Sequence, residues 1–220
     1  MPRTARASLA GMWYHVLNRG NRRETVFHKP ADYDAFVKAM ADATARLPLD
    51  LLGYRLMPNH FHLVLRPHAD GDLGRWMQWL LTAHARRYHR HYGTSGHIWQ
   101  GRFRAFPVQD DEHLIAVLRY VERNALRAEL VARAEDWKWS SLACWLRGDA
   151  MLWTGDPPVR GQNWQARVNE SLSAGDLQRL RHSVARGRPF GDETWTAKTA
   201  ERLGLEFCLR PRGRPRKSEA

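Results

Sequence analysis

The stretch HFHLVLR, residues 60–66, places two histidines one residue apart in a run that is typical of a β-strand. Side chains alternate between the faces of a strand, so His60 and His62 share one face while Phe61 and Leu63 share the other. Two interpretations follow. The imidazoles either form a polar strand face toward solvent, which this stretch alone favours, or they are two ligands of a metal site that takes its third ligand from elsewhere.

The segments on either side of this strand alternate between strand-like and helix-like patterns. Further strands are expected at 12–18, 49–57 and 102–108, and the spacing of apolar residues predicts helices at 30–47, 73–90 and 111–131. The order β, α, β, β, α, β, α predicts an α+β fold. We expect a ferredoxin-like, RRM-like antiparallel sheet with helices on one face.

The chain beyond this sheet changes in character. A GDPP loop at 155–158 marks a boundary, and short helices are predicted over 173–186 and over 192–203, the second with Asp192 as N-cap and Gly204 after its end. The final stretch, RPRGRPRKSEA, has no large apolar residue, so it is expected to be flexible. We therefore predict a main domain over 1–150, a small helical C-terminal extension over 151–207 and a flexible basic tail over 208–220.

Composition narrows the class of protein. The 220 residues include 35 Lys and Arg against 23 Asp and Glu, and the resulting net charge of +12 attracts polyanions, nucleic acid above all. The only cysteines, Cys144 and Cys208, argue against a disulfide framework or a cysteine zinc cluster. No signal peptide and no membrane span are apparent. We expect an intracellular protein, cytoplasmic and associated with the nucleoid, with no membrane partner.

The helix predicted over 111–131 offers a third ligand and a nucleophile. Tyr120 and Asn124 are four residues apart, so they lie one above the other at the border of its buried stripe. An asparagine within a helix competes with the backbone for hydrogen bonds and therefore indicates a partner. If the helix crosses the face of His60 and His62, Asn124 adds an oxygen ligand, and Tyr120 stands beside a phosphate held by the cation. A cation and basic surroundings favour the phenolate, the nucleophilic form of tyrosine.

These motifs resemble a known superfamily. HFH is similar to the His–hydrophobic–His motif of the HUH endonucleases, and the downstream Tyr-x-x-x-Asn has the order of their single-tyrosine transposases. YHVLNRGNRRETVF, GHIWQGRFRAFPV and RGRPFGDETWTAKTAERLGLE with its RPRGRPRK tail resemble one branch, the REP-associated tyrosine transposases. The resemblance covers nearly the whole chain. One departure is that Ala125, Leu126 and Glu129 stand where the family commonly has Pro, Val and Gly.

The resemblance implies a function for residues 1–150 as the catalytic domain. It implies metal-dependent, site-specific cleavage and rejoining of single-stranded DNA at palindromic, REP-type hairpins, through a 5′-phosphotyrosine on Tyr120. His60, His62 and Asn124 would hold Mg²⁺ or Mn²⁺, and imidazole ligands suit Mn²⁺ somewhat better. The enzyme would act as a monomer or homodimer. Charge and position suggest DNA-binding roles for Arg19, Arg22, Arg23, Arg102, Arg104, Arg212 and Arg214.

Other interpretations stay open at this point. One is a non-catalytic RRM-like protein that binds single-stranded nucleic acid, and another is a nuclease that acts through metal-activated water. The arginines of the helix at 73–90 form either a solvated face or a track for a phosphate backbone. The tail RPRGRPRK, 210–217, is either an AT-hook for the minor groove of A·T-rich DNA or a plain basic tail.

Overall fold

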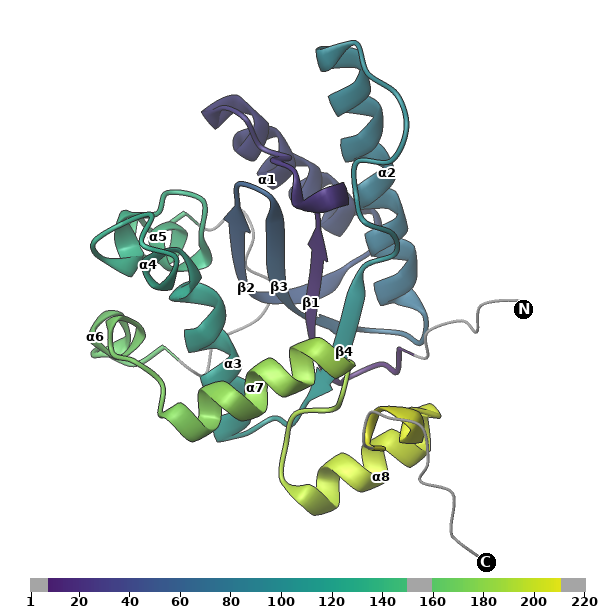
Figure 1. Ribbon diagram of the computed structural model, residues 1–220, viewed down its shortest axis with the longest axis vertical. Helices are drawn as coiled ribbons and strands as arrows, with labels where there is room; N and C mark the ends of the chain where they lie inside the picture. The colour runs from purple at the N-terminus through teal and green to yellow at the C-terminus, as the bar shows by residue number, and fades with distance from the viewer. Residues whose placement is uncertain (1–7, 150–159, 211–220) are drawn as a thin grey trace, which may run out of the picture.

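The sheet is the centre of the fold. The structure is a computed structural model that describes residues 8–149 and 160–210. Four strands form one antiparallel sheet in the order β2-β3-β1-β4 (Figure 1). They are β1 (Trp13–Arg19), β2 (Leu49–Met57), β3 (His60–Pro67) and β4 (Arg104–Val108). This order is that of the ferredoxin-like βαββαβ unit, and the predicted α+β class is confirmed.

Two long helices cover one face of the sheet. They are α1 (Pro30–Arg46), which begins with proline at its first turn, and α2 (Asp72–Tyr92). Phe36 of α1 and Trp76 of α2 pack in a buried apolar cluster that also contains Phe61 and Leu63 of β3. The helices of the βαββαβ unit therefore lie on a single face, as predicted.

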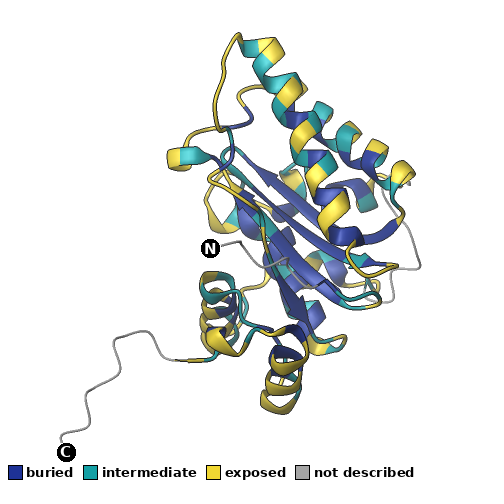
Figure 2. Ribbon diagram, turned by 90° about the vertical axis from the view of Figure 1, so that its right-hand side faces the viewer, coloured by how far each residue is buried: buried dark blue, intermediate teal, exposed yellow. Residues whose placement is uncertain are grey.

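The opposite face is covered by α3 (Glu112–Glu122), which follows that unit. The Asp111 carboxylate accepts a hydrogen bond from the His113 backbone amide and so caps the helix, as the sequence suggests. Leu118 of α3 belongs to a second buried cluster with Val64 of β3 and Phe106 of β4. The face of β3 that carries His62 is thus interior, and the interpretation of a solvent-exposed histidine face is wrong. Figure 2 shows the sheet buried between the layers of helices.

The helix that carries Tyr120 is shorter than predicted. Rather than one helix to residue 131, α3 ends at Glu122, a short α4 (Asn124–Arg127) follows, and Arg123 lies at the junction with φ −87° and ψ −6°. Glu129 then takes a left-handed φ of 57°. A helix cannot continue through a residue in this conformation, so the helical segment ends before Glu129.

Several shorter elements complete the described chain, and most follow the sequence pattern. Asp192 caps α8 by accepting from the Trp195 amide, and Gly204 ends that helix with φ 63°, which confirms both predictions. The elements are α5 (Ser141–Leu146), α6 (Trp164–Asn169), α7 (Ala174–Arg186), α8 (Glu193–Leu203) and 3₁₀ turns at Asn21–Arg23, Ala134–Asp136 and Glu206–Cys208.

A buried carboxylate joins α3 to this later part of the chain. Glu122 is fully buried and accepts hydrogen bonds from the Ser141 hydroxyl, the Arg160 guanidinium and the Trp164 indole N–H. Arg160 also donates to the backbone oxygen of Leu52, in β2. The predicted domain boundaries at 150 and 207 remain predictions, and residues 211–220 of the predicted tail, with Arg212 and Arg214, lie outside the described residues.

Two further observations bear on the predicted class. Within the described residues, no helix is long and apolar enough to cross a membrane. Cys144 and Cys208 are both free and buried, in agreement with the expected absence of a disulfide framework.

Candidate active site

The strand register gathers the candidate residues on one face of the sheet. In the antiparallel pair of β1 and β3, Arg19 lies opposite His60 and Leu17 lies opposite His62. Residues opposite each other in such a pair point to the same face. Arg19, His60 and His62 therefore share the face that α3 covers, and Arg19 is next to the histidine pair, as a phosphate-binding residue would be.

One ring nitrogen of His60 is held by its neighbour. Its Nδ1 lies 2.7 Å from Oδ1 of Asn59, and Asn59 Nδ2 donates to the Arg23 backbone oxygen over 3.0 Å. Because the Asn59 amide oxygen can only accept, the His60 Nδ1 carries the proton of this hydrogen bond. The lone pair of the neutral ring is then on Nε2.

The Nδ1 of His62 is also in a hydrogen bond, and its partner is a second histidine, so either ring can be the donor. Nδ1 of His62 lies 2.8 Å from Nε2 of His15, which is fully buried in β1. Metal-binding histidines commonly use their second ring nitrogen for such a hydrogen bond, which orients the ring. His15 lies in the strand predicted at 12–18, and the register of β1 and β3 makes it a diagonal neighbour of His62. Without that register the sequence does not show that the two histidines meet.

Both candidate ligands are held neutral. Burial, with the nearby charges of Arg19 and Arg127, lowers the pKa of His60 to about 4. Burial, followed by the surrounding His15, His60, Arg127 and Arg19, lowers the pKa of His62 well below its usual value. A neutral imidazole is the form that binds a metal ion, so at neutral pH neither ring must lose a proton first.

Tyr120 lies beside the histidines. Its ring centroid is 5.9 Å from that of His62 and 6.1 Å from that of His15, and both pairs meet edge to face. The guanidinium of Arg127 lies 5.7 Å from the Tyr120 ring centroid. The structure therefore brings the predicted nucleophile to the predicted ligands and adds a cation that the sequence analysis did not name.

Asn124 is buried at the start of α4, and its link to the histidines is indirect. Its Oδ1 accepts a hydrogen bond from Arg127 over 3.0 Å, and its buried Nδ2 has no hydrogen-bond partner. Among the described residues, neither His60 nor His62 is hydrogen-bonded to Asn124. Arg127 connects them, because it contacts Asn124 and also lowers the pKa of both histidines.

The other predicted DNA-binding arginines that the structure describes are exposed. Arg104 faces the same side as the histidines, because it pairs with Leu17 across β1 and β4. Arg22 and Arg23 lie in the turn after β1 with left-handed φ values of 51° and 66°. Asn59 ties this turn to His60 through the Arg23 carbonyl. Arg102 lies in the segment just before β4.

A second cluster of potential metal ligands has a structural explanation. Asp111, Glu112 and His113 offer ligand atoms within 4.8 Å of one another at the first turn of α3. The Asp111 carboxylate is already engaged by the backbone amide and by Nδ1 of His113. This cluster is the N-terminal cap of α3, and Tyr120 lies about two turns away on the same helix.

Comparison with known families gives the class of protein to which this fold and site belong, the DNA-processing transposases. The family model described as "Transposase IS200 like" matches residues 8–124, which include His60, His62, Tyr120 and Asn124. The chain belongs to this family of transposases.

Solved structures are similar to the chain, and the first of the two below shares the fold. A REP-associated tyrosine transposase bound to a REP hairpin is similar over 79% of this chain and 100% of its own, with 20% identity and a TM-score of 0.54. A candidate transposase from Deinococcus radiodurans R1 is similar over 58% of this chain and 92% of its own, with 18% identity and a TM-score of 0.38. No curated protein matches the chain.

Proposed function

We propose that this transposase cleaves and rejoins single-stranded DNA beside hairpins of the palindromic, REP type, with Tyr120 as the nucleophile. The observation that carries the proposal is the position of the Tyr120 ring next to His62, whose Nδ1 is engaged by His15. The fold is similar to that of a REP-associated tyrosine transposase, which supports the proposal that the chain belongs to this branch of the family.

The donor set fits a divalent cation. His60 and His62 each have Nδ1 in a hydrogen bond, so each would present Nε2 as a ligand. Asn124 would add its Oδ1, which has a second lone pair besides the one that Arg127 uses. When bound, Mg²⁺ or Mn²⁺ would polarise a phosphate oxygen and offset its charge.

The reaction is a transesterification on this chain's own side chain. The Tyr120 oxygen attacks the phosphorus of a phosphodiester and loses its proton, and the bond from phosphorus to the 3′ oxygen breaks. The 3′ oxygen takes up a proton and leaves as a free hydroxyl, while the 5′ phosphate stays on Tyr120. Arg127 and Arg19 stabilise the negative charge that develops, and attack by the 3′ hydroxyl of another strand reverses the step.

The test is a denaturing gel of the protein with a hairpin oligonucleotide, with Mn²⁺ or with chelator. The oligonucleotide is labelled on the 3′ side of the cleavage site, in the fragment whose 5′ phosphate would become joined to Tyr120. We expect a labelled protein–DNA adduct that requires the metal. Cleavage without an adduct would indicate a nuclease that uses water, and binding without cleavage under any metal would favour the RRM-like binding protein. Either result would overturn the proposal, and membership of the transposase family argues against the second.

A further inference from the structure

The outward side of α2 carries a stripe of hydrogen-bond donors. Its members follow each other at intervals of three or four residues, so they point the same way along a helix of 21 residues, which is about 30 Å long. All are exposed. The residues of this α2 stripe are Arg75, Gln78, Thr82, Arg86 and Arg90.

The charges of this helix are of one sign. After Asp72, which pairs with Arg75, α2 contains no acidic residue. The neighbouring α1 differs, because at the same spacing of four it alternates Asp34, Lys38, Asp42 and Arg46. An ordinary solvated helix face carries both signs in this way. The α2 stripe lacks this alternation of charge, so its composition differs from that of a helix face that only keeps a protein soluble.

Two of its arginines are free. No hydrogen bond or ion pair joins Arg86 or Arg90 to any other described residue, whereas the adjacent Arg87 pairs with Asp32. Arg86 and Arg90 are four residues apart, a spacing at which like charges destabilise a helix. An anion bound along the stripe would relieve this repulsion.

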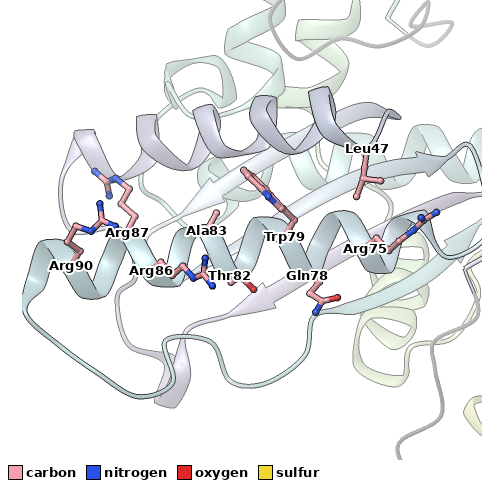
Figure 3. A pocket seen from close by; sticks show the side chains of 9 residues that line it. All are labelled: Leu47, Arg75, Gln78, Trp79, Thr82, Ala83, Arg86, Arg87 and Arg90. Carbon is pink, nitrogen blue, oxygen red and sulfur yellow. The ribbon is translucent and has the colours of Figure 1, made fainter.

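The stripe borders a groove. The hollow has a volume of about 720 Å³, and its lining includes Leu47 and Trp79. Figure 3 shows the side chains that line it, with the arginines of α2 among them. Trp79 is half-buried, and the Arg46 guanidinium lies 5.1 Å from its ring centroid. The groove thus presents cations and amide or hydroxyl groups, with a single partly covered aromatic ring.

The groove and the candidate active site lie on opposite sides of the sheet. α2 packs on the face of Phe61 and Leu63, while His60 and His62 belong to the face that α3 covers. The groove cannot hold the phosphate that Tyr120 attacks. Any DNA in it is a different part of the substrate.

We propose that the α2 stripe binds the phosphate backbone of the double-stranded stem of the DNA whose single strand enters the active site. The inference rests on the proposed function. Arginine, glutamine and threonine are the side chains that contact phosphates and position a duplex without reading its sequence. Single-stranded DNA would call for a row of exposed aromatic side chains on which bases stack, and the stripe has none.

The experiment measures DNA binding by fluorescence anisotropy without metal, over a range of salt concentrations. The variant is Arg86→Gln/Arg90→Gln, and the matched control is Arg181→Gln/Arg202→Gln, which removes the same charge from exposed positions on α7 and α8. With a long-stemmed hairpin, the stripe variant should bind about tenfold more weakly. Its slope of log affinity against log salt should be smaller by about 2, since each phosphate contact contributes about 0.9.

The probes separate the outcomes. The stripe variant should bind an unstructured single strand nearly as wild type does, and its melting temperature without DNA should equal or exceed that of wild type. Equal losses in the stripe and control variants, or an equal loss on the single strand, would overturn the proposal. If wild type itself forms no adduct, the proposed function fails while the binding comparison still decides the role of the stripe.

Discussion

His15 Nε2 lies 2.8 Å from His62 Nδ1, between two strands of the same sheet. Both side chains are buried, and burial lowers the pKa of His15 to about 3. The pair is therefore neutral, and one hydrogen bond joins an N–H of one ring to the lone pair of the other. If the proton is on His62, its Nε2 is presented to a ligand in a fixed orientation.

Replacement of His15 tests this orientation. Gln at position 15 keeps an acceptor near the former Nε2, while Phe fills the space without one. We expect His15→Phe to weaken Mn²⁺ binding, measured by titration calorimetry without DNA, by about 10–100-fold. His15→Gln should recover most of the affinity. Equal affinities in the two variants, with both folded by circular dichroism, would show that His15 only fills the core.

Tyr120→Phe removes one oxygen and keeps the ring that packs against His15 and His62. The variant should bind the hairpin within about twofold of wild type and form neither cleaved product nor adduct, because the nucleophile is lost. Tyr88→Phe, on α2, serves as the control and should cleave normally. Cleavage by Tyr120→Phe at the wild-type rate would reject the assignment.

Asn124→Ala removes the proposed oxygen ligand and the acceptor of Arg127. Cleavage in Mg²⁺ should fall by at least about tenfold, and high Mn²⁺ should restore part of it, since imidazoles remain and suit that ion. His62→Ala should not be restored. Cleavage rates measured over a range of Mg²⁺ and Mn²⁺ concentrations distinguish the two variants. If Asn124→Ala needs the same metal concentration as wild type, Asn124 is not a metal ligand.

His84 makes stability depend on pH at a distance from the active site. It is buried on α2, and burial, then the Arg87 charge, lowers its pKa from 6.5 to about 4. Between these values the unfolded chain binds a proton that the folded chain does not. The stability is complete above about pH 6.5 and falls as the pH approaches 4. In urea denaturation between pH 7 and pH 4, the free energy of unfolding of His84→Leu should fall by about 2–3 kcal/mol less than that of wild type. An equal fall in the two proteins would contradict this prediction.

Glu129→Gly tests the backbone at the end of α4. Glu129 is exposed and has a φ of 57°, a conformation that is unfavourable for residues with a Cβ atom. Glycine removes that strain but adds freedom to the unfolded chain, so we expect a net gain of about 0.5–1 kcal/mol in the free energy of unfolding. Glu129→Ala should give no gain. Thermal denaturation of the three proteins measures the difference.

The sequence was sufficient for the strands and helices of the sheet because their patterns are local. Pro30, Asp111, Asp192 and Gly204 each mark a helix end through a contact with nearby backbone or through their own backbone geometry. The interruption at Arg123 could not be predicted in this way. Helical spacing continues through it, and only the left-handed Glu129 beyond α4 shows that the helix stops.

The candidate site was predicted in part. His60, His62 and Tyr120 could be named because strand alternation and helical spacing fix directions within one element. The contact of Asn59 with its neighbour His60 is local, whereas the contacts of His15 and Arg127 depend on the register between β1 and β3 and on how α4 turns after Arg123, and neither of these is a local property. The packing of Trp99 against Phe61 in the core likewise joins segments that are far apart in the sequence.

The buried Glu122 has a consequence for attempts to divide the protein. It lies two residues after Tyr120, and two of its three hydrogen-bond donors, Arg160 and Trp164, come from beyond residue 150. A fragment ending at residue 150 would lose Arg160 and Trp164 and would leave the buried Glu122 with the Ser141 hydroxyl and the nearby charge of the buried Arg55. Removal of one partner of a buried ion pair typically destabilises a protein by about 3–5 kcal/mol, a large share of the stability of a typical domain. The segment that the sequence sets apart as an extension thus supplies Arg160, an ion-pair partner of the helix that carries Tyr120.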